Sequence, residues 1–132
     1  MFAYISGFTA WSSVREPAQV FQLLETIYQA FDHAARKRKV FKVETIGGCY
    51  VAVTGLPDPQ KDHAVIMMKF AYECLTKTNY LTEQLETSLV PETEDLMMRI
   101  GLHSGPVTAG VLRGEKSRIQ LFGDTVATAS RM

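Results

Sequence analysis

The fold is decided by residues 40–54, which read VFKVETIGGCYVAVT. Two runs rich in β-branched and aromatic residues flank the pair Gly47-Gly48, and such a pair suits the tight two-residue turn of a β-hairpin. The stretch therefore predicts two antiparallel strands, Val40–Ile46 and Cys49–Thr54, joined by that turn.

Upstream of the hairpin, the sequence predicts one strand and one helix. Phe2–Ser6 is short and strand-like, and Pro17 suits the first position of a helix. An apolar stripe at helical spacing carries this helix to about Ala35. Its members are Val20, Phe21, Leu24, Ile27, Tyr28 and Phe31.

Downstream of the hairpin, a second helix is expected from about Asp62 to about Thr78. One apolar face of it is formed by Val65, Met68, Tyr72 and Leu75. The segment Glu83–Asp95 is rich in Glu and Thr and is expected to be a mobile loop. A short extension of the helix is the alternative, carried by Leu81, Leu85 and Leu89.

The last third of the chain predicts three strands and a closing helix. The strands are Leu96–His103, Val107–Leu112 and Arg118–Phe122, and the helix begins at Asp124. The order strand, helix, strand, strand, helix, strand, followed by an added hairpin, predicts an α+β fold of the ferredoxin-like βαββαβ plan. Its sheet is antiparallel, with helices on one face. This plan alone leaves function open, because RNA binders, regulatory domains and enzymes all use it.

Composition excludes several classes of protein. The chain has 132 residues, expected to form a single domain over 1–132, with 14 Lys plus Arg against 14 Asp plus Glu. Zero net charge argues against nucleic acid as a partner, and no run is long and apolar enough for direct membrane insertion. Cys49 and Cys74 are expected to be free thiols in a reducing compartment. His33, His63 and His103 are too dispersed to suggest zinc.

Four segments together resemble the class III nucleotide cyclase (adenylate/guanylate cyclase) catalytic domain, in its guanylate-cyclase-like form. They are FAYISGFT at 2–9, FKVETIGGCY at 41–50, RIGLHSGPV at 99–107 and LFGDTVATASRM at 121–132. The resemblance covers essentially the whole chain and implies the same ferredoxin-like core. It also implies a domain that is incomplete at its C-terminus, and possibly at its N-terminus, because the family continues past Met132.

The resemblance implies a metal site that this sequence does not keep. Active family members hold two Mg²⁺ or Mn²⁺ ions between two aspartates, and the matching positions here are Tyr4 and Gly48. A phenol with a pKa near 10 is a poor ligand for a hard cation, and glycine has no side chain. No metal or other cofactor is therefore expected. Local propensity offers a simpler reason for both residues, since Tyr favours strands and Gly favours tight turns.

A third departure lies in the closing helix. The family pattern has an Asn that orients the ribose, and this chain has Ala127 there. Arg131, four residues on, matches the Arg that stabilises charge in the transition state. Loss of one preorganised donor typically costs about 10² to 10³ in rate.

The positions that recognise the nucleotide base match the family pattern more closely than the metal-binding positions do. Glu44 matches the Glu by which guanylate cyclases recognise guanine, and Arg118 also fits their pattern. Gln120 stands where those enzymes have Cys and adenylate cyclases have Asp, which leaves the choice between GTP and ATP open. The alternative for Glu44 is an ordinary exposed strand residue paired with a neighbour.

Phosphate binding is expected from the turn formed by Ser6, Gly7, Phe8 and Thr9. Its backbone amides open a helix and can face a phosphate group. Without metal ions to offset the triphosphate charge, this turn alone is expected to bind weakly.

The resulting expectation is a catalytically silent or severely impaired domain that forms a homodimer, or a heterodimer with another cyclase domain. Because the family builds each active site from two chains, a regulatory or scaffold role follows. The expected location is cytoplasmic, as a free protein or as the cytoplasmic domain of a larger membrane protein. Two alternatives stay open: an active guanylate or adenylate cyclase that makes cyclic nucleotide and pyrophosphate, and a small-molecule sensor on the same fold.

Overall fold

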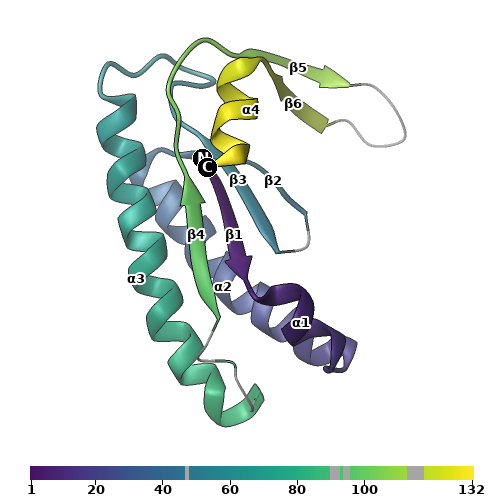
Figure 1. Ribbon diagram of the computed structural model, residues 1–132. Coiled ribbons are helices and arrows are strands. Elements are labelled where there is room, and N and C mark those ends of the chain that lie inside the picture. Colours follow the sequence, from purple (N-terminus) through teal and green to yellow (C-terminus); the bar gives the residue numbers. More distant parts are fainter. Residues whose placement is uncertain (47, 90–92, 94–95, 113–117) are drawn as a thin grey trace.

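The computed structural model describes residues 1–46, 48–89, 93, 96–112 and 118–132 (Figure 1). Its elements follow the predicted order, with one additional helix. They are β1 (Phe2–Ser6), α1 (Phe8–Ser13), α2 (Pro17–Arg38), β2 (Phe41–Ile46), β3 (Cys49–Val53), α3 (His63–Leu89), β4 (Met97–Gly101), β5 (Thr108–Leu112), β6 (Arg118–Phe122) and α4 (Asp124–Arg131).

The four-stranded sheet has the order β2-β3-β1-β4, and every neighbouring pair is antiparallel. This order confirms the ferredoxin-like plan, because β1 lies between β3 and β4 with β2 at the outer edge. In the register, Tyr4 lies opposite Cys49 on one side and Arg99 on the other. The added hairpin forms a separate sheet of β5 and β6.

The two long helices, α2 and α3, lie together on one face of this sheet, as expected (Figure 1). Ala3 and Ile5 of β1 point toward them and are buried, because alternate residues of a strand face the same side. An aromatic cluster fills the space between the layers. Its members are Tyr28, Phe31, Tyr50 and Phe70.

The opposite face of the sheet carries α4. Tyr4 points to this side, and its hydroxyl contacts the backbone of Ser130 in α4. Gly101 of β4 lets the helix approach, since a Cβ there would lie 2.3 Å from the carbonyl oxygen of Ala129. The short helix therefore packs against β1 and β4 at the end of the sheet away from α1 (Figure 1).

Two helices differ from the sequence-based expectation. Helix α1 was not predicted, because the polar residues before Pro17 carry no helical pattern. Its one buried residue is Trp11, which anchors the helix to the domain. Helix α3 runs on to Leu89, so the alternative of a helical extension is confirmed and a loop beginning at Glu83 is wrong. The rest of that expected loop lies partly outside the described residues. None of the helices in the described part of the chain is long and apolar enough to cross a membrane.

The face of α3 that the structure buries also differs from the predicted one. Tyr72 is 74% exposed and Met68 is 61% exposed, so the predicted stripe does not face the core. The buried face instead holds Met67, Phe70, Ala71 and Cys74, with Thr78 and Thr82 further along. Both threonines donate their hydroxyl protons to helix carbonyls four residues back, which removes the cost of burying them.

Candidate functional site

Tyr4 lies in the middle of the sheet face that α4 covers. Its hydroxyl donates a 2.9 Å hydrogen bond to the backbone carbonyl of Ser130, and its ring stacks on Phe2 with centroids 6.4 Å apart. Burial raises the pKa of Tyr4 above its usual value of 10, and Cys49 adds to the shift. At neutral pH the side chain is a neutral phenol already engaged with a protein carbonyl.

Gly48 lies beside Tyr4 at the end of the β2–β3 turn. Its carbonyl accepts a 3.0 Å hydrogen bond from the amide of Ile5, which fixes it against β1. A Cβ on Gly48 would lie 2.9 Å from Cδ1 of Phe8. The turn of residues 6–9 and the hairpin turn therefore meet at this point.

The Ser6–Thr9 turn has the backbone geometry of a helix start. Gly7 has a left-handed φ of 83°, which favours glycine, and its carbonyl accepts the first helical bond from the amide of Trp11. No side chain caps the helix. The predicted phosphate-binding turn thus opens α1, which is only six residues long.

The donor set at these two positions does not suit Mg²⁺ or Mn²⁺. Both ions prefer several oxygen ligands with charged carboxylates among them. The phenol of Tyr4 donates a hydrogen bond to the backbone carbonyl of Ser130, and Gly48 has no side chain. Within the described residues, no group of three or more His, Cys, Asp and Glu side chains could hold a metal ion.

Glu44 lies on β2 and lines a small cavity of about 200 Å³ on the same face of the sheet as Tyr4. It is half-buried and pairs in register with Val51. The other lining residues are apolar, namely Phe2, Val43, Val51, Leu121 and Val126. One carboxylate in an apolar slot can orient a flat, hydrogen-bonding ring.

Glu44 also has an electrostatic effect on the neighbouring strand. Burial raises the pKa of the Cys49 thiol, and the Glu44 carboxylate raises it further. Cys49 and Cys74 are both free, as expected. In the register, Cys49 lies opposite Tyr4 of β1 and Ile46 of β2.

Helix α4 carries the remaining predicted residues. Ala127 and Arg131 are one turn apart on it, and Arg131 is exposed. Arg118 and Gln120 lie on β6, opposite Leu112 and Gly110. The side chains of Arg118 and Gln120 fall outside the described part of the structure, so their placement stays a prediction.

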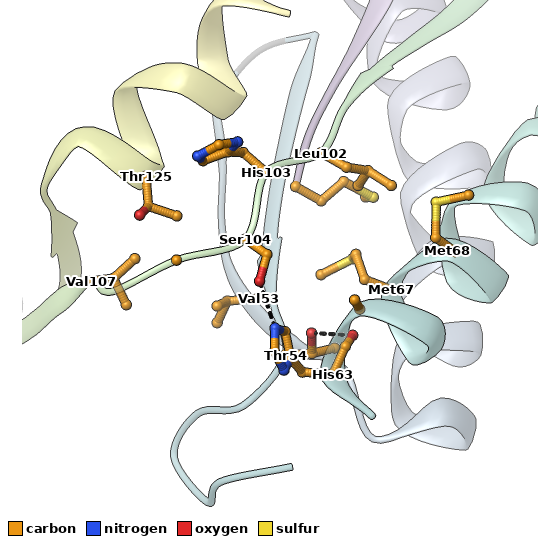
Figure 2. Close-up of a pocket in the computed structure, with 13 residues that line it drawn as sticks. Val53, Thr54, His63, Met67, Met68, Leu102, His103, Ser104, Val107 and Thr125 are labelled. Carbon is orange, nitrogen blue, oxygen red and sulfur yellow. Dashed lines mark hydrogen bonds between the residues drawn. The ribbon is translucent and has the colours of Figure 1, made fainter. Parts of the chain in front are cut away.

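A second pocket, of about 220 Å³, holds none of the predicted site residues (Figure 2). It lies between the start of α3, the end of β3 and the segment that joins β4 to β5. His63 sits at its edge, where Nε2 lies 2.6 Å from Oγ of Ser104 and Nδ1 lies 3.3 Å from the carbonyl oxygen of Gln60. Both ring nitrogens of His63 therefore have a hydrogen-bond partner.

The structure brings together Tyr4, Gly48 and the Ser6–Thr9 turn, and it places the cavity of Glu44 next to them on the same sheet face. Two contacts at this site could not be predicted from local sequence patterns. Ser130 is 126 residues from Tyr4 in the chain, and only the fold joins them. Phe8 looked like part of a phosphate turn, whereas its ring packs against Gly48.

These features define an α+β domain of ferredoxin-like plan in which a short helix partly covers the open sheet face above a small slot with one carboxylate. The chain belongs to the adenylate and guanylate cyclase catalytic domain family, which matches residues 1–132. A receptor-type guanylate cyclase of Caenorhabditis elegans is 44% identical over 131 residues, which are 99% of this chain and 10% of that protein. The chain thus spans about a tenth of the length of this relative.

Solved structures agree with this assignment. The guanylate cyclase domain of RhGC from Catenaria anguillulae, in complex with GTP, superimposes with a TM-score of 0.82 at 37% identity. A dimeric guanylyl cyclase domain from Blastocladiella emersonii gives a TM-score of 0.83 at 39% identity. Each match covers 99% of this chain, and it covers 68% and 69% of the solved chains, respectively. Dimeric assemblies therefore occur among its relatives.

Proposed function

We propose that this chain is a catalytically silent or severely impaired guanylate-cyclase-like domain that keeps part of its nucleotide-recognition side. The observation that carries the proposal is that neither Tyr4 nor Gly48, which match the two metal-binding aspartates of the family, has a carboxylate. The hydroxyl of Tyr4 donates a hydrogen bond to the backbone carbonyl of Ser130, and Gly48 has no side chain. A two-metal site stabilises both the attacking and the leaving oxygen in phosphoryl transfer, and these residues supply no charged ligand for it.

Ala127 supports the same conclusion independently. The position that matches the ribose-orienting Asn has no hydrogen-bonding side chain, although Arg131 remains one turn away. Loss of one such donor alone costs about 10² to 10³ in rate. Combined with the missing carboxylates, the expected rate lies more than 10³ below that of an intact relative.

Base recognition is the part of the function that the geometry supports. The carboxylate of Glu44 borders an apolar slot of about 200 Å³, into which Val126 of α4 also projects. A carboxylate accepts hydrogen bonds from the N1 and N2 donors of guanine, whereas adenine offers no such pair of donors. GTP is therefore the favoured nucleotide. ATP is the alternative, because Gln120 stands where guanylate cyclases have Cys and adenylate cyclases have Asp.

The role that follows is a dimerising, regulatory subunit. A homodimer would lack both carboxylates in each of its sites. In a heterodimer, a partner with intact aspartates would complete one site, to which this chain supplies Glu44, Arg118 and Arg131. The proposed location is cytoplasmic, as a free protein or as the cytoplasmic domain of a larger membrane protein, and the similarity to a receptor-type guanylate cyclase supports it.

The test measures cyclic GMP and cyclic AMP formed from GTP and ATP by the purified full chain in Mn²⁺. The GTP-binding domain from Catenaria anguillulae serves as the positive control. Product formation more than about 10³-fold below the control is expected. A rate within 100-fold of the control contradicts the proposal and supports an active cyclase. Tight nucleotide binding that does not depend on metal ions supports the small-molecule sensor instead.

A further inference from the structure

A pocket of about 220 Å³ lies between the start of α3, the end of β3 and the segment that joins β4 to β5 (Figure 2). Helix α4 borders it through Thr125. The pocket shares no lining residue with the cavity of Glu44, and none of the residues predicted for the candidate site lines it. It is therefore a separate space, for which the proposed function gives no use.

The walls of the pocket are mainly apolar, and two of them are flexible methionines. Met67 of α3 is buried, whereas the next residue, Met68, lines the pocket with 61% of its surface exposed. Val53 of β3 and Leu102 after β4 are further apolar wall residues. An apolar cavity of about 150 Å³ holds benzene, so this pocket has room for one aromatic ring with a small substituent.

Two hydroxyl groups at the pocket use their protons within the protein. Oγ1 of Thr54 donates a 2.8 Å hydrogen bond to the carbonyl oxygen of His63. Nδ1 of His63 lies 3.3 Å from the carbonyl oxygen of Gln60, which can only accept, so in the neutral imidazole the proton is on Nδ1. Nε2 is then an acceptor, and Oγ of Ser104, 2.6 Å away, donates to it. Both hydroxyl oxygens therefore offer only lone pairs to a ligand.

The charge of the lining restricts the ligand further. Among the residues that the structure describes, no lining side chain belongs to Lys, Arg, Asp or Glu. An ion would lose its hydration in this pocket without meeting an opposite charge, so a neutral molecule is favoured. Its donor group would face Ser104 and Thr54, because the other polar side chains, Thr125 and His103, lie on the α4 side of the pocket (Figure 2).

We propose that this pocket binds a compact neutral molecule with one aromatic ring and one hydrogen-bond donor, of the phenol or indole class. The ring lies beside Met67, because thioether sulfur makes favourable contacts with aromatic rings. The donor group binds Oγ of Ser104 or Oγ1 of Thr54. The inference does not depend on the proposed function, since it uses neither the cavity of Glu44 nor the metal-binding positions.

The first experiment titrates the full chain with phenol and follows the methionine methyl groups by NMR. The signals of Met67 and Met68 are expected to shift, with a dissociation constant of about 1 mM or below. Met97 is the internal control, because it is 63% exposed, as Met68 nearly is, and does not line the pocket. Unchanged Met67 and Met68 signals at ten times that phenol concentration overturn the inference.

The second experiment compares phenol with anisole and benzoate to test the class of ligand. Anisole keeps the ring and an oxygen but has no donor, and benzoate keeps the ring but carries a charge. Phenol is expected to bind about threefold to tenfold more tightly than anisole, which corresponds to one neutral hydrogen bond. Benzoate is expected to bind more weakly than either. Equal affinities for phenol and anisole, or tighter binding of benzoate, overturn the inference.

Ala64→Leu and Val65→Leu test whether phenol binds in this pocket. Ala64 lines it, whereas its neighbour Val65 is 53% exposed and does not. Both substitutions place a good helix former at an exposed position of α3, so both variants are expected to fold. Ala64→Leu fills the pocket and is expected to weaken phenol binding by at least about tenfold, and Val65→Leu by less than about twofold. Equal affinities of the two variants overturn the pocket as the binding site.

Discussion

The hydroxyl of Tyr4 donates a hydrogen bond of 2.9 Å to the carbonyl of Ser130, and this bond ties the central strand β1 to the end of α4. Ser130 belongs to the short helix on the open face of the sheet. Tyr4 is therefore part of the packing between the sheet and α4.

Tyr4→Phe removes this bond and keeps the ring. A lost hydrogen bond of this kind costs about 1 kcal/mol, so the free energy of unfolding is expected to fall by about that amount. Amide hydrogen exchange in α4 is expected to accelerate more than exchange in α2, because the bond holds only the short helix. Tyr80→Phe is the control, since Tyr80 is 59% exposed on α3. Equal effects of the two substitutions would contradict this role of Tyr4.

Gly101→Ala tests how closely α4 approaches β4. An added Cβ would lie 2.3 Å from the carbonyl oxygen of Ala129 and 2.8 Å from Cβ of Met132. The backbone has to shift, and overpacking of this kind costs about 1–3 kcal/mol. Chemical denaturation measures the loss. Gly110→Ala on the open strand β5 should change stability by less than about 0.5 kcal/mol, and a similar cost at both positions would show that α4 does not press on Gly101.

Phe70→Ala and Tyr72→Ala test the buried face of α3. Phe70 is fully buried in the aromatic cluster, and truncating a buried Phe costs about 3–5 kcal/mol. Tyr72 is 74% exposed two residues away, and its truncation is expected to change stability by about 0.5 kcal/mol or less. Comparing the thermal unfolding of the two variants distinguishes the buried face of α3 from the exposed face. A large loss at Tyr72 would show that another surface covers it.

The cavity of Glu44 predicts weak, metal-independent binding of guanine. Because no carboxylates offset the triphosphate charge, guanosine is expected to bind at least as well as GTP, and added Mg²⁺ is expected to change neither affinity. Glu44→Gln replaces one acceptor oxygen with a donor and should weaken guanosine binding about tenfold. Saturation-transfer NMR with guanosine and adenosine measures this. Stronger binding of GTP in Mg²⁺ would contradict the prediction.

The two thiols are expected to react slowly with iodoacetamide. Only the thiolate reacts, and burial, together with the smaller effect of the Glu73 carboxylate, raises the pKa of Cys74 to about 12. Burial, followed by the charge of Glu44, raises the pKa of Cys49 above its usual value of 9. Below these pKa values the thiolate fraction grows tenfold for each pH unit, so alkylation rates should rise with pH. Cys49, which is half-buried, should react before Cys74.

The outcome of that alkylation also checks the electrostatics of the site. Glu44→Gln removes the carboxylate charge that opposes the Cys49 thiolate, so Cys49 should react faster in this variant at the same pH. Cys74 lies on α3 and should react at an unchanged rate. Mass spectrometry of the labelled peptides separates the two sites. An unchanged rate at Cys49 would show that Glu44 does not act on it.

The sequence by itself determined the strands, the two long helices and their order, but not α1 (Phe8–Ser13). The hairpin followed from two β-rich runs around Gly47-Gly48, and α2 followed from its apolar period and Pro17, because both signals are local. The order of elements then allowed only a few topologies, of which the ferredoxin-like one was observed. The residues of the candidate site, including Glu44 and Tyr4, were named from the resemblance of four segments to the cyclase family.

Only the tertiary structure decided how those residues are used. Tyr72 and Phe70 are both apolar and near neighbours on one helix, and it is the position of the sheet that buries one and exposes the other. The bond from Tyr4 to Ser130 joins residues that are 126 positions apart. The contact of Phe8 with Gly48 likewise joins two turns that are remote in the chain. Local sequence indicates secondary structure, through residue propensities and the spacing of apolar residues. Contacts between remote segments depend on close packing, which forms only when the whole chain has folded.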